Sequence, residues 1–182
     1  KELKKEYLSA DKKGFCVYFV GLSGCGKSTL ANFLISKLYE LTNRKVTYLD
    51  GDVVRRELSK GLGFSKEDRS KNVRRIGFVC SEVVKHGGVA VAANIAPYEE
   101  DRLHNKASIS SNGEYIEVFV KTDLSVCEDR DVKGLYKLAR EGVIKQFTGI
   151  SDPFEEPKNS SIVVDGNDDL NKNMISTKIV TE

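Results

Sequence analysis

The stretch GLSGCGKS, residues 21–28, decides the fold of this chain. It fits the pattern G-x-x-x-x-G-K-[ST], a loop whose backbone N–H groups surround the phosphates of a nucleotide. Its glycines permit backbone conformations that a side chain would forbid, so successive N–H groups can converge on one anion. Lys27 would then neutralise phosphate oxygens, and the Ser28 hydroxyl would face a magnesium ion at the start of the next helix.

The segments on both sides of this loop favour phosphate binding over an ordinary glycine turn. Residues 15–20 form an unbroken apolar run of strand length, as expected for a strand buried on both faces of a parallel sheet. Residues 29–41 place leucine and phenylalanine at helical spacing. Strand, loop and helix therefore follow one another in the order that the motif requires.

Length and composition bound the class of protein. The 182 residues predict one domain, over residues 1–182, with a core of its own. The chain is 40% hydrophobic and 31% charged with a net charge of +2, which indicates a globular protein and argues against nucleic acid or a membrane surface as partner. Cys16, Cys25, Cys80 and Cys127 form no C-x-x-C pair, so we expect buried, reduced thiols rather than metal ligands.

Further apolar segments predict strands, with helical patterns between them. Strands alternate with helices along the first 120 residues, which implies a parallel sheet with right-handed crossovers. Charge and glycine then dominate residues 129–158, which we interpret as a mobile lid that closes over phosphates. The expected strands are residues 15–20, 45–49, 89–95, 115–120 and 161–165, with a terminal helix from residue 168 onward. The predicted fold class is α/β, with a central five-stranded parallel sheet.

Charged residues gather where the carboxyl ends of the strands are expected. Asp50 and Asp52 follow the second strand, at the edge where α/β sheets bind ligands. Residues 55–75 are rich in arginine and lysine. Within them, Arg69 and Asn72 stand three apart near a helix start, so both can reach one ligand on the same side. For any single arginine of this run, a solvated helix face is an equally good interpretation.

These features together are typical of an enzyme that transfers phosphoryl groups. They are a phosphate-binding loop, acidic residues at strand ends, and cations on a neighbouring helix and on a lid. Position and charge stabilise the transferred group, and no covalent nucleophile is needed. The guanine-specifying pattern N-K-x-D is absent from the sequence, which argues against a GTPase. The basic run with Phe64 beside it favours an acceptor that is anionic and carries a flat ring.

Several segments beyond the loop make the chain resemble the adenylyl-sulfate kinases, which act on adenosine 5′-phosphosulfate (APS). The resemblance runs from about residue 14 to residue 165. It rests on GLSG at 21–24, LDGD at 49–52 with Arg55, LGFS at 62–65 with Asp68, Arg69 and Asn72, Ile95 with PY at 97–98, RDVKGLY at 130–136 and FTGI at 147–150. It implies a P-loop nucleoside/nucleotide-kinase-like three-layer sandwich. It also implies that ATP and Mg2+ support phosphorylation of the APS 3′-hydroxyl, giving 3′-phosphoadenosine 5′-phosphosulfate and ADP in sulfate assimilation.

The resemblance further implies a role for each matching residue. Lys27 and Asp52 would be catalytic, Asp52 by taking the proton of the 3′-hydroxyl or by placing the metal, with Asp50 the less favoured candidate. Phe64 and Phe147 would stack on the acceptor adenine. The ATP-binding residues would be Gly21, Ser23, Gly24, Cys25, Gly26, Lys27, Ser28, Thr29 and Arg130. The acceptor-binding residues would be Asp50, Asp52, Arg55, Phe64, Arg69, Asn72, Ile95, Lys133 and Phe147, and the metal ligands Ser28 and Asp52.

Each assignment has a structural alternative. Phe64 and Phe147 are also typical of core residues that anchor loops. Asp52 is also typical of a helix cap, and Arg130 and Lys133 of solvated lid charges.

Two positions depart from the family's pattern. Ala96 stands where the family usually has a serine, phosphorylated in some members, and Leu138 replaces the second lysine of the lid segment. Direct transfer from ATP to the acceptor needs no such serine, so we expect activity to survive.

Two other functions fit the same loop. A nucleotide-sensing module is one, although such modules tend to lose the loop residues, and Lys27 and Ser28 are intact here. A kinase for another small acceptor is the second. As partners, the resemblance suggests a homodimer and fusion to, or partnership with, ATP sulfurylase. The expected location is the cytoplasm, or the plastid stroma if a transit peptide has been removed.

Overall fold

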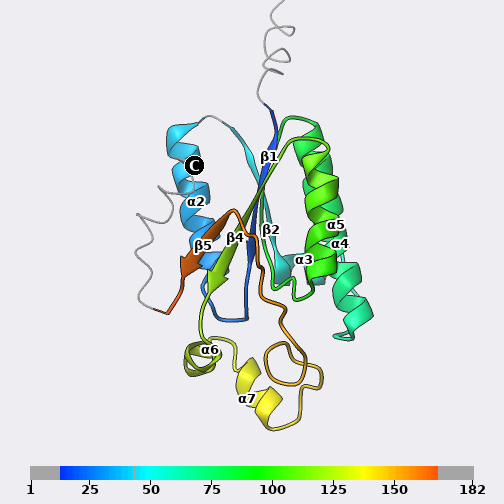
Figure 1. Ribbon diagram of the computed structural model, residues 1–182, viewed down its shortest axis with the longest axis vertical. Helices are drawn as coiled ribbons and strands as arrows, with labels where there is room; N and C mark the ends of the chain where they lie inside the picture. Colours follow the sequence, from blue (N-terminus) through cyan, green and yellow to red (C-terminus); the bar gives the residue numbers. More distant parts are fainter. Residues whose placement is uncertain (1–12, 43, 168–182) are drawn as a thin grey trace, which may run out of the picture.

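A computed structural model describes residues 13–42 and 44–167. The terminal helix expected from residue 168 lies outside these residues. The described part forms a three-layer arrangement in which helices cover both faces of a central sheet (Figure 1). This confirms the α/β fold class predicted from the sequence.

The sheet contains five parallel strands in the spatial order β2-β3-β1-β4-β5. Their bounds are β1 Phe15–Val20, β2 Val46–Asp50, β3 Val89–Ala93, β4 Glu114–Lys121 and β5 Ile162–Asp165. Near the end of β1, Phe19 lies opposite Ala93 of β3 on one side and Val118 of β4 on the other. The strand that leads into the P-loop is therefore central, and its end is held by two neighbours.

The helices divide between the two faces of the sheet. Their bounds are α2 Lys27–Leu41, α3 Gly51–Glu57, α4 Lys66–Lys85, α5 Glu99–Ser110, α6 Leu124–Arg130 and α7 Leu135–Arg140. Figure 1 shows α2 on one face and the adjacent helices α4 and α5 on the other. Among the described residues, no helix combines the length and the apolar character that crossing a membrane requires.

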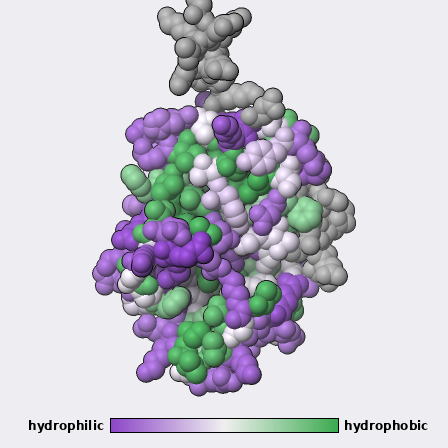
Figure 2. All heavy atoms as spheres, turned by 180° about the vertical axis from the view of Figure 1, so that it is seen from behind, coloured by the Kyte–Doolittle hydropathy of each residue, from purple (hydrophilic) through white to green (hydrophobic). Residues whose placement is uncertain are grey.

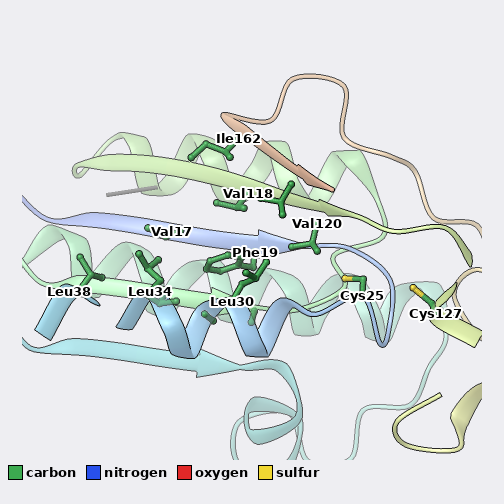
Figure 3. Packing of buried hydrophobic residues seen from close by; sticks show 14 of the residues in the cluster. Val17, Phe19, Cys25, Leu30, Leu34, Leu38, Val118, Val120, Cys127 and Ile162 are labelled. Carbon is green, nitrogen blue, oxygen red and sulfur yellow. The ribbon is translucent and has the colours of Figure 1, made fainter. Parts of the chain in front are cut away.

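The alternation of β1 side chains supplies a core to each face. Val17 and Phe19 point to one face, where Leu30, Leu34 and Leu38 of α2 meet them (Figure 3). A fully buried side chain of this size contributes about 1.5–3 kcal/mol relative to leaving it exposed. Burial of the α2 leucines therefore fixes the helix directly behind the phosphate loop.

The opposite face of β1 packs under α4. Cys16, Tyr18 and Val20 contact Ile76 and Cys80 of that helix in a second buried cluster. Helix α4 begins at the predicted place, where the Ser65 side chain caps the Asp68 N–H. Docking of α4 brings its first turn to the carboxyl ends of the strands.

The predicted lid, residues 129–158, contains the short helix α7 and the last two residues of α6. Tyr136 and Phe147 anchor it, with their rings 5.0 Å apart in a T-shaped contact. Val132 and Val143, by contrast, are exposed. Hydrophobic atoms gather at the lower end of the molecule in Figure 2, the end at which α6 and α7 lie in Figure 1. The lid thus contributes Tyr136, Ala139 and Phe147 to the core and leaves Val132 and Val143 exposed.

Candidate active site

A cavity of about 350 Å³ lies at the carboxyl ends of the strands, between the P-loop, α3, the start of α4, residues 93–97 and the lid. It brings together most of the residues selected from the sequence. These are Ser23, Gly24, Gly26, Lys27, Ser28, Thr29, Asp50, Asp52, Arg55, Phe64, Arg69, Asn72, Ile95, Lys133 and Phe147. Gly21, Cys25 and Arg130 do not line it. Cys25 is fully buried beneath the loop, and Arg130 donates to the Asn167 carbonyl, 3.2 Å away.

The P-loop has a geometry suited to an anion. Gly26, the residue before α2, has φ 104°, a left-handed conformation that glycine adopts without strain. The first turn of α2, whose leading N–H groups have no partner within the helix, lines the cavity. The Lys27 amine donates to the Leu22 carbonyl at 2.6 Å and lies 3.5 Å from Cys25 Sγ, so its charge is held against the loop.

Asp50 is the best-connected carboxylate of the site. It is the N-cap of α3 and accepts from the Asp52 N–H at 2.9 Å, so the alternative that Asp52 caps this helix is wrong. Ser28 Oγ donates to Asp50 Oδ2 at 3.0 Å. Burial acts to raise the pKa of Asp50, but hydrogen bonds from Asp52, Ser28 and Tyr48 outweigh it, so the pKa lies below its ordinary value of 3.8.

Asp52, two residues later, has a different environment. Its carboxylate is exposed to the cavity and forms an ion pair with Lys133 of the lid. Lys133 therefore has a partner across the cavity, while half of its side chain remains exposed to solvent. This pair joins the lid to the strand ends at the point where a base would be needed.

Arg55 and Phe64 form one wall of the cavity. The Arg55 guanidinium lies 4.5 Å from the centre of the Phe64 ring, and Arg55 Nη1 donates to the Gly63 carbonyl at 3.0 Å. Phe64 is 53% exposed, so the alternative that it is a core residue is wrong. The exposed Phe64 ring lines the cavity, where a flat ligand could stack on it in place of the Arg55 guanidinium.

Arg69 is buried, and its side-chain contacts tie the start of α4 to residues 148–152 of the lid. Nε donates to the Phe64 carbonyl at 2.8 Å, Nη1 donates to Thr148 Oγ1, and Nη2 pairs with Asp152 at 3.2 Å. Burial lowers the pKa of Arg69, but an arginine remains charged at neutral pH. Sequence reasoning did not select Thr148 and Asp152, although both lie in or just after the FTGI segment.

The remaining walls combine a buried ring and a strained loop. Phe147 is buried in the core cluster and also lines the cavity, so both interpretations of this residue hold in part. Ala96 has φ 43°, an unusual value for a residue with a side chain, and its carbonyl accepts from the buried Arg102 at 2.8 Å. Arg102, which sequence reasoning also missed, therefore supports the loop on the acceptor side.

Comparison with known proteins decides the family. The family model described as adenylylsulphate kinase matches residues 13–165. The chain belongs to the adenylylsulphate kinase family. The adenylyl-sulfate kinase of Gloeothece citriformis is 52% identical over 151 residues, which cover 83% of this chain and 84% of the relative.

Solved structures of adenylylsulphate kinases share the fold. The structure of the Mycobacterium tuberculosis APS kinase CysC in complex with AMPPNP and APS has a TM-score of 0.87 at 36% identity, and the match covers 93% of this chain and 97% of that one. The hexameric APS kinase from Thiobacillus denitrificans has a TM-score of 0.70 at 37% identity, with 99% of this chain and 30% of that one covered. Likeness to both supports a P-loop kinase fold across the described residues.

Proposed function

We propose that this protein transfers the γ-phosphoryl group of ATP to the 3′-hydroxyl of adenosine 5′-phosphosulfate. The observation that carries the proposal is a single cavity that holds the P-loop lysine, an exposed carboxylate, and a cationic and aromatic wall. The similar mycobacterial enzyme, whose structure contains AMPPNP and APS, supports the same pair of substrates.

At the nucleotide end, the P-loop N–H groups and Lys27 would hold the ATP phosphates. Lys27 would exchange the Leu22 carbonyl for phosphate oxygens, because an anion attracts the amine more strongly than a neutral carbonyl does. The lid, residues 129–158, would exclude water from the transferred group. Arg130, which does not line the cavity, would lie near the ATP side of the lid.

The residues beside the loop fit a magnesium ion. Ser28 and Asp52 present hydroxyl and carboxylate oxygens, the ligand type that Mg2+ prefers. Within residues 13–42 and 44–167 no cluster of three or more His, Cys, Asp or Glu could hold a metal ion, so phosphates and water would supply the other ligands. The ion would neutralise charge on the phosphates when bound.

At the acceptor end, Arg55, Arg69 and Asn72 would hold the phosphosulfate, and Phe64 with Phe147 would sandwich the adenine. Asp52 would accept the proton of the 3′-hydroxyl. The hydroxyl oxygen would attack the γ-phosphorus of ATP while the bond between that phosphorus and the bridging oxygen of the departing ADP breaks.

Lys133 would leave Asp52 for the newly bound anions, which frees the carboxylate to act as a base. The ion pair thus links the lid to Asp52 without occupying the acceptor pocket permanently.

The test is ADP release from MgATP with APS, AMP or adenosine as acceptor. Of the three acceptors, we expect only APS to give strong ADP release, because neither AMP nor adenosine offers the sulfate to Arg55 and Arg69. Lys27→Ala should abolish turnover and leave the circular dichroism spectrum unchanged. Equal release with all three acceptors would contradict the assignment of the acceptor, and full activity of Lys27→Ala would contradict the assignment of the loop.

A further inference from the structure

Tyr48, in β2, touches the site from behind without lining the cavity. Its hydroxyl donates to Asp50 Oδ2 at 3.0 Å, the same oxygen that accepts from Ser28 Oγ at 3.0 Å. The other carboxylate oxygen, Oδ1, accepts from the Asp52 N–H at 2.9 Å. Three donors from three elements therefore fix one carboxylate.

The direction of the Ser28 hydroxyl proton decides what its oxygen can bind. A hydroxyl has one proton and two lone pairs, so an oxygen that faces a cation must direct its proton elsewhere. Here the proton goes to Asp50 Oδ2, which leaves the lone pairs of Ser28 Oγ for the loop side. Groups that orient a metal ligand in this way are commonly required for full metal affinity.

Tyr48 can serve only as a donor to Asp50. Its partner is a carboxylate, which accepts hydrogen bonds and has no proton to give, so the Tyr48 hydroxyl must be the donor. Its ring packs against the core cluster between α2 and the sheet, which holds the hydroxyl in place. Asp50 itself is only half-buried and would otherwise be free to turn toward solvent.

We propose that Tyr48 is a positioning residue for the metal–nucleotide end of the site. It holds the Asp50 carboxylate in the orientation that receives the Ser28 proton, and Ser28 in turn faces the magnesium ion. The proposal rests on the proposed function only for binding of a magnesium nucleotide, and it is independent of the acceptor.

The test compares ADP affinity with and without Mg2+ by calorimetry, in the wild type and in Tyr48→Phe. We expect Tyr48→Phe to raise the Kd of ADP about ten-fold in the presence of Mg2+, the effect of one lost hydrogen bond to a charged group. The Kd of ADP without Mg2+ should stay unchanged, because the loop and Lys27 are intact. A general loss of structure would raise both constants together.

Tyr115→Phe is the matched control. Tyr115 also donates from a strand to a carboxylate two residues later, Glu117 Oε2, at 3.0 Å, but it lies away from the cavity. Its removal should leave the Mg2+ dependence of ADP binding unchanged.

A second variant separates positioning from stability. Asp50→Asn should weaken ADP binding in the presence of Mg2+ and leave it unchanged in its absence. The double variant Tyr48→Phe/Asp50→Asn should bind ADP no more weakly than Asp50→Asn alone, because Tyr48 acts only through the Asp50 carboxylate. Additive losses, or equal losses with and without Mg2+, would overturn the proposal. If APS-dependent turnover is absent while the Mg2+-selective loss is present, the acceptor assignment fails and the role of Tyr48 stands.

Discussion

Asp50 and Asp52 carry the same side chain two residues apart, but the groups that surround each carboxylate differ. Asp50 accepts hydrogen bonds from Ser28, Tyr48 and the Asp52 N–H, which leaves it little freedom to exchange protons with a substrate. Asp52 is exposed and pairs only with a lysine from the lid among the described residues. We therefore infer that Asp50 orders the loop and that Asp52 faces the reacting hydroxyl.

The lowered pKa of Asp50 predicts a pH-dependent contribution to stability. The folded-state pKa lies below the ordinary value of 3.8, so Asp50 stabilises the fold above about pH 4, and this contribution is lost as the pH falls through the folded-state value. Urea unfolding of the wild type and of Asp50→Asn should differ most near pH 6, and the gap should close below pH 4. A gap that is constant from pH 7 to pH 3 would contradict this role.

Phe64→Ala tests the aromatic wall. Because half of the ring is exposed, its removal should cost little stability and should act on ligand binding. We expect the KM for APS to rise about ten-fold, the usual effect of one lost stacking contact, with the KM for ATP unchanged.

Phe78→Ala is the control for that experiment. Phe78 is also an exposed phenylalanine, but it lies on α4 away from the cavity. Both KM values should match those of the wild type. An unchanged KM for APS in Phe64→Ala would contradict adenine stacking on this ring.

At the scale of elements, the crossing of α4 and α5 sets the position of the acceptor wall. A Cβ at Gly77 would overlap the side-chain amide of Asn105, which reaches past the glycine to donate to the Val73 carbonyl at 3.0 Å. The same amide donates to the Tyr18 hydroxyl at 3.2 Å. Glycine at this position thus lets α5, α4 and β1 share one buried polar contact.

Gly77→Ala should therefore destabilise the protein despite the higher helix propensity of alanine. We expect a loss of about 1–3 kcal/mol in urea unfolding, since a methyl group is forced into a filled contact. Combining it with Asn105→Ala should cost clearly less than the sum of the two single changes, because the clash disappears with the amide. Strict additivity would show that the helices do not meet in this way.

At the scale of the whole molecule, the fold buries the side chains of all four cysteines. Cys16, Cys25, Cys80 and Cys127 are buried and free of disulfides, which confirms the burial predicted from the sequence. Burial also raises the pKa of Cys127 to about 11, and thiolates are the reactive form.

The native protein should therefore react slowly with a thiol reagent. We expect less than about one thiol per chain to react within minutes in buffer, and all four to react at once in guanidinium chloride. Rapid modification of several thiols without denaturant would contradict a closed core on both faces of the sheet.

Much of the fold was predictable because its signals are local. The buried run before GLSGCGKS, the glycines of the loop and the leucines of α2 follow one another in the chain, so pattern alone predicts strand, loop and helix. The five strands were also predicted, with ends that differ by one or two residues for most of them. The strand order was not, since pairing of distant segments leaves no local pattern.

The sequence by itself determined the phosphate loop, the α/β fold class, the buried cysteines and, through its motifs, the candidate site residues. Only the tertiary structure decided which of these residues contact one another. Lys133 meets Asp52 across 81 positions of the chain, Arg69 meets Thr148 across 79, and Ser28 meets Asp50 across 22. Such contacts depend on how helices and lid dock on the sheet, and docking is a property of the packed molecule rather than of any one segment.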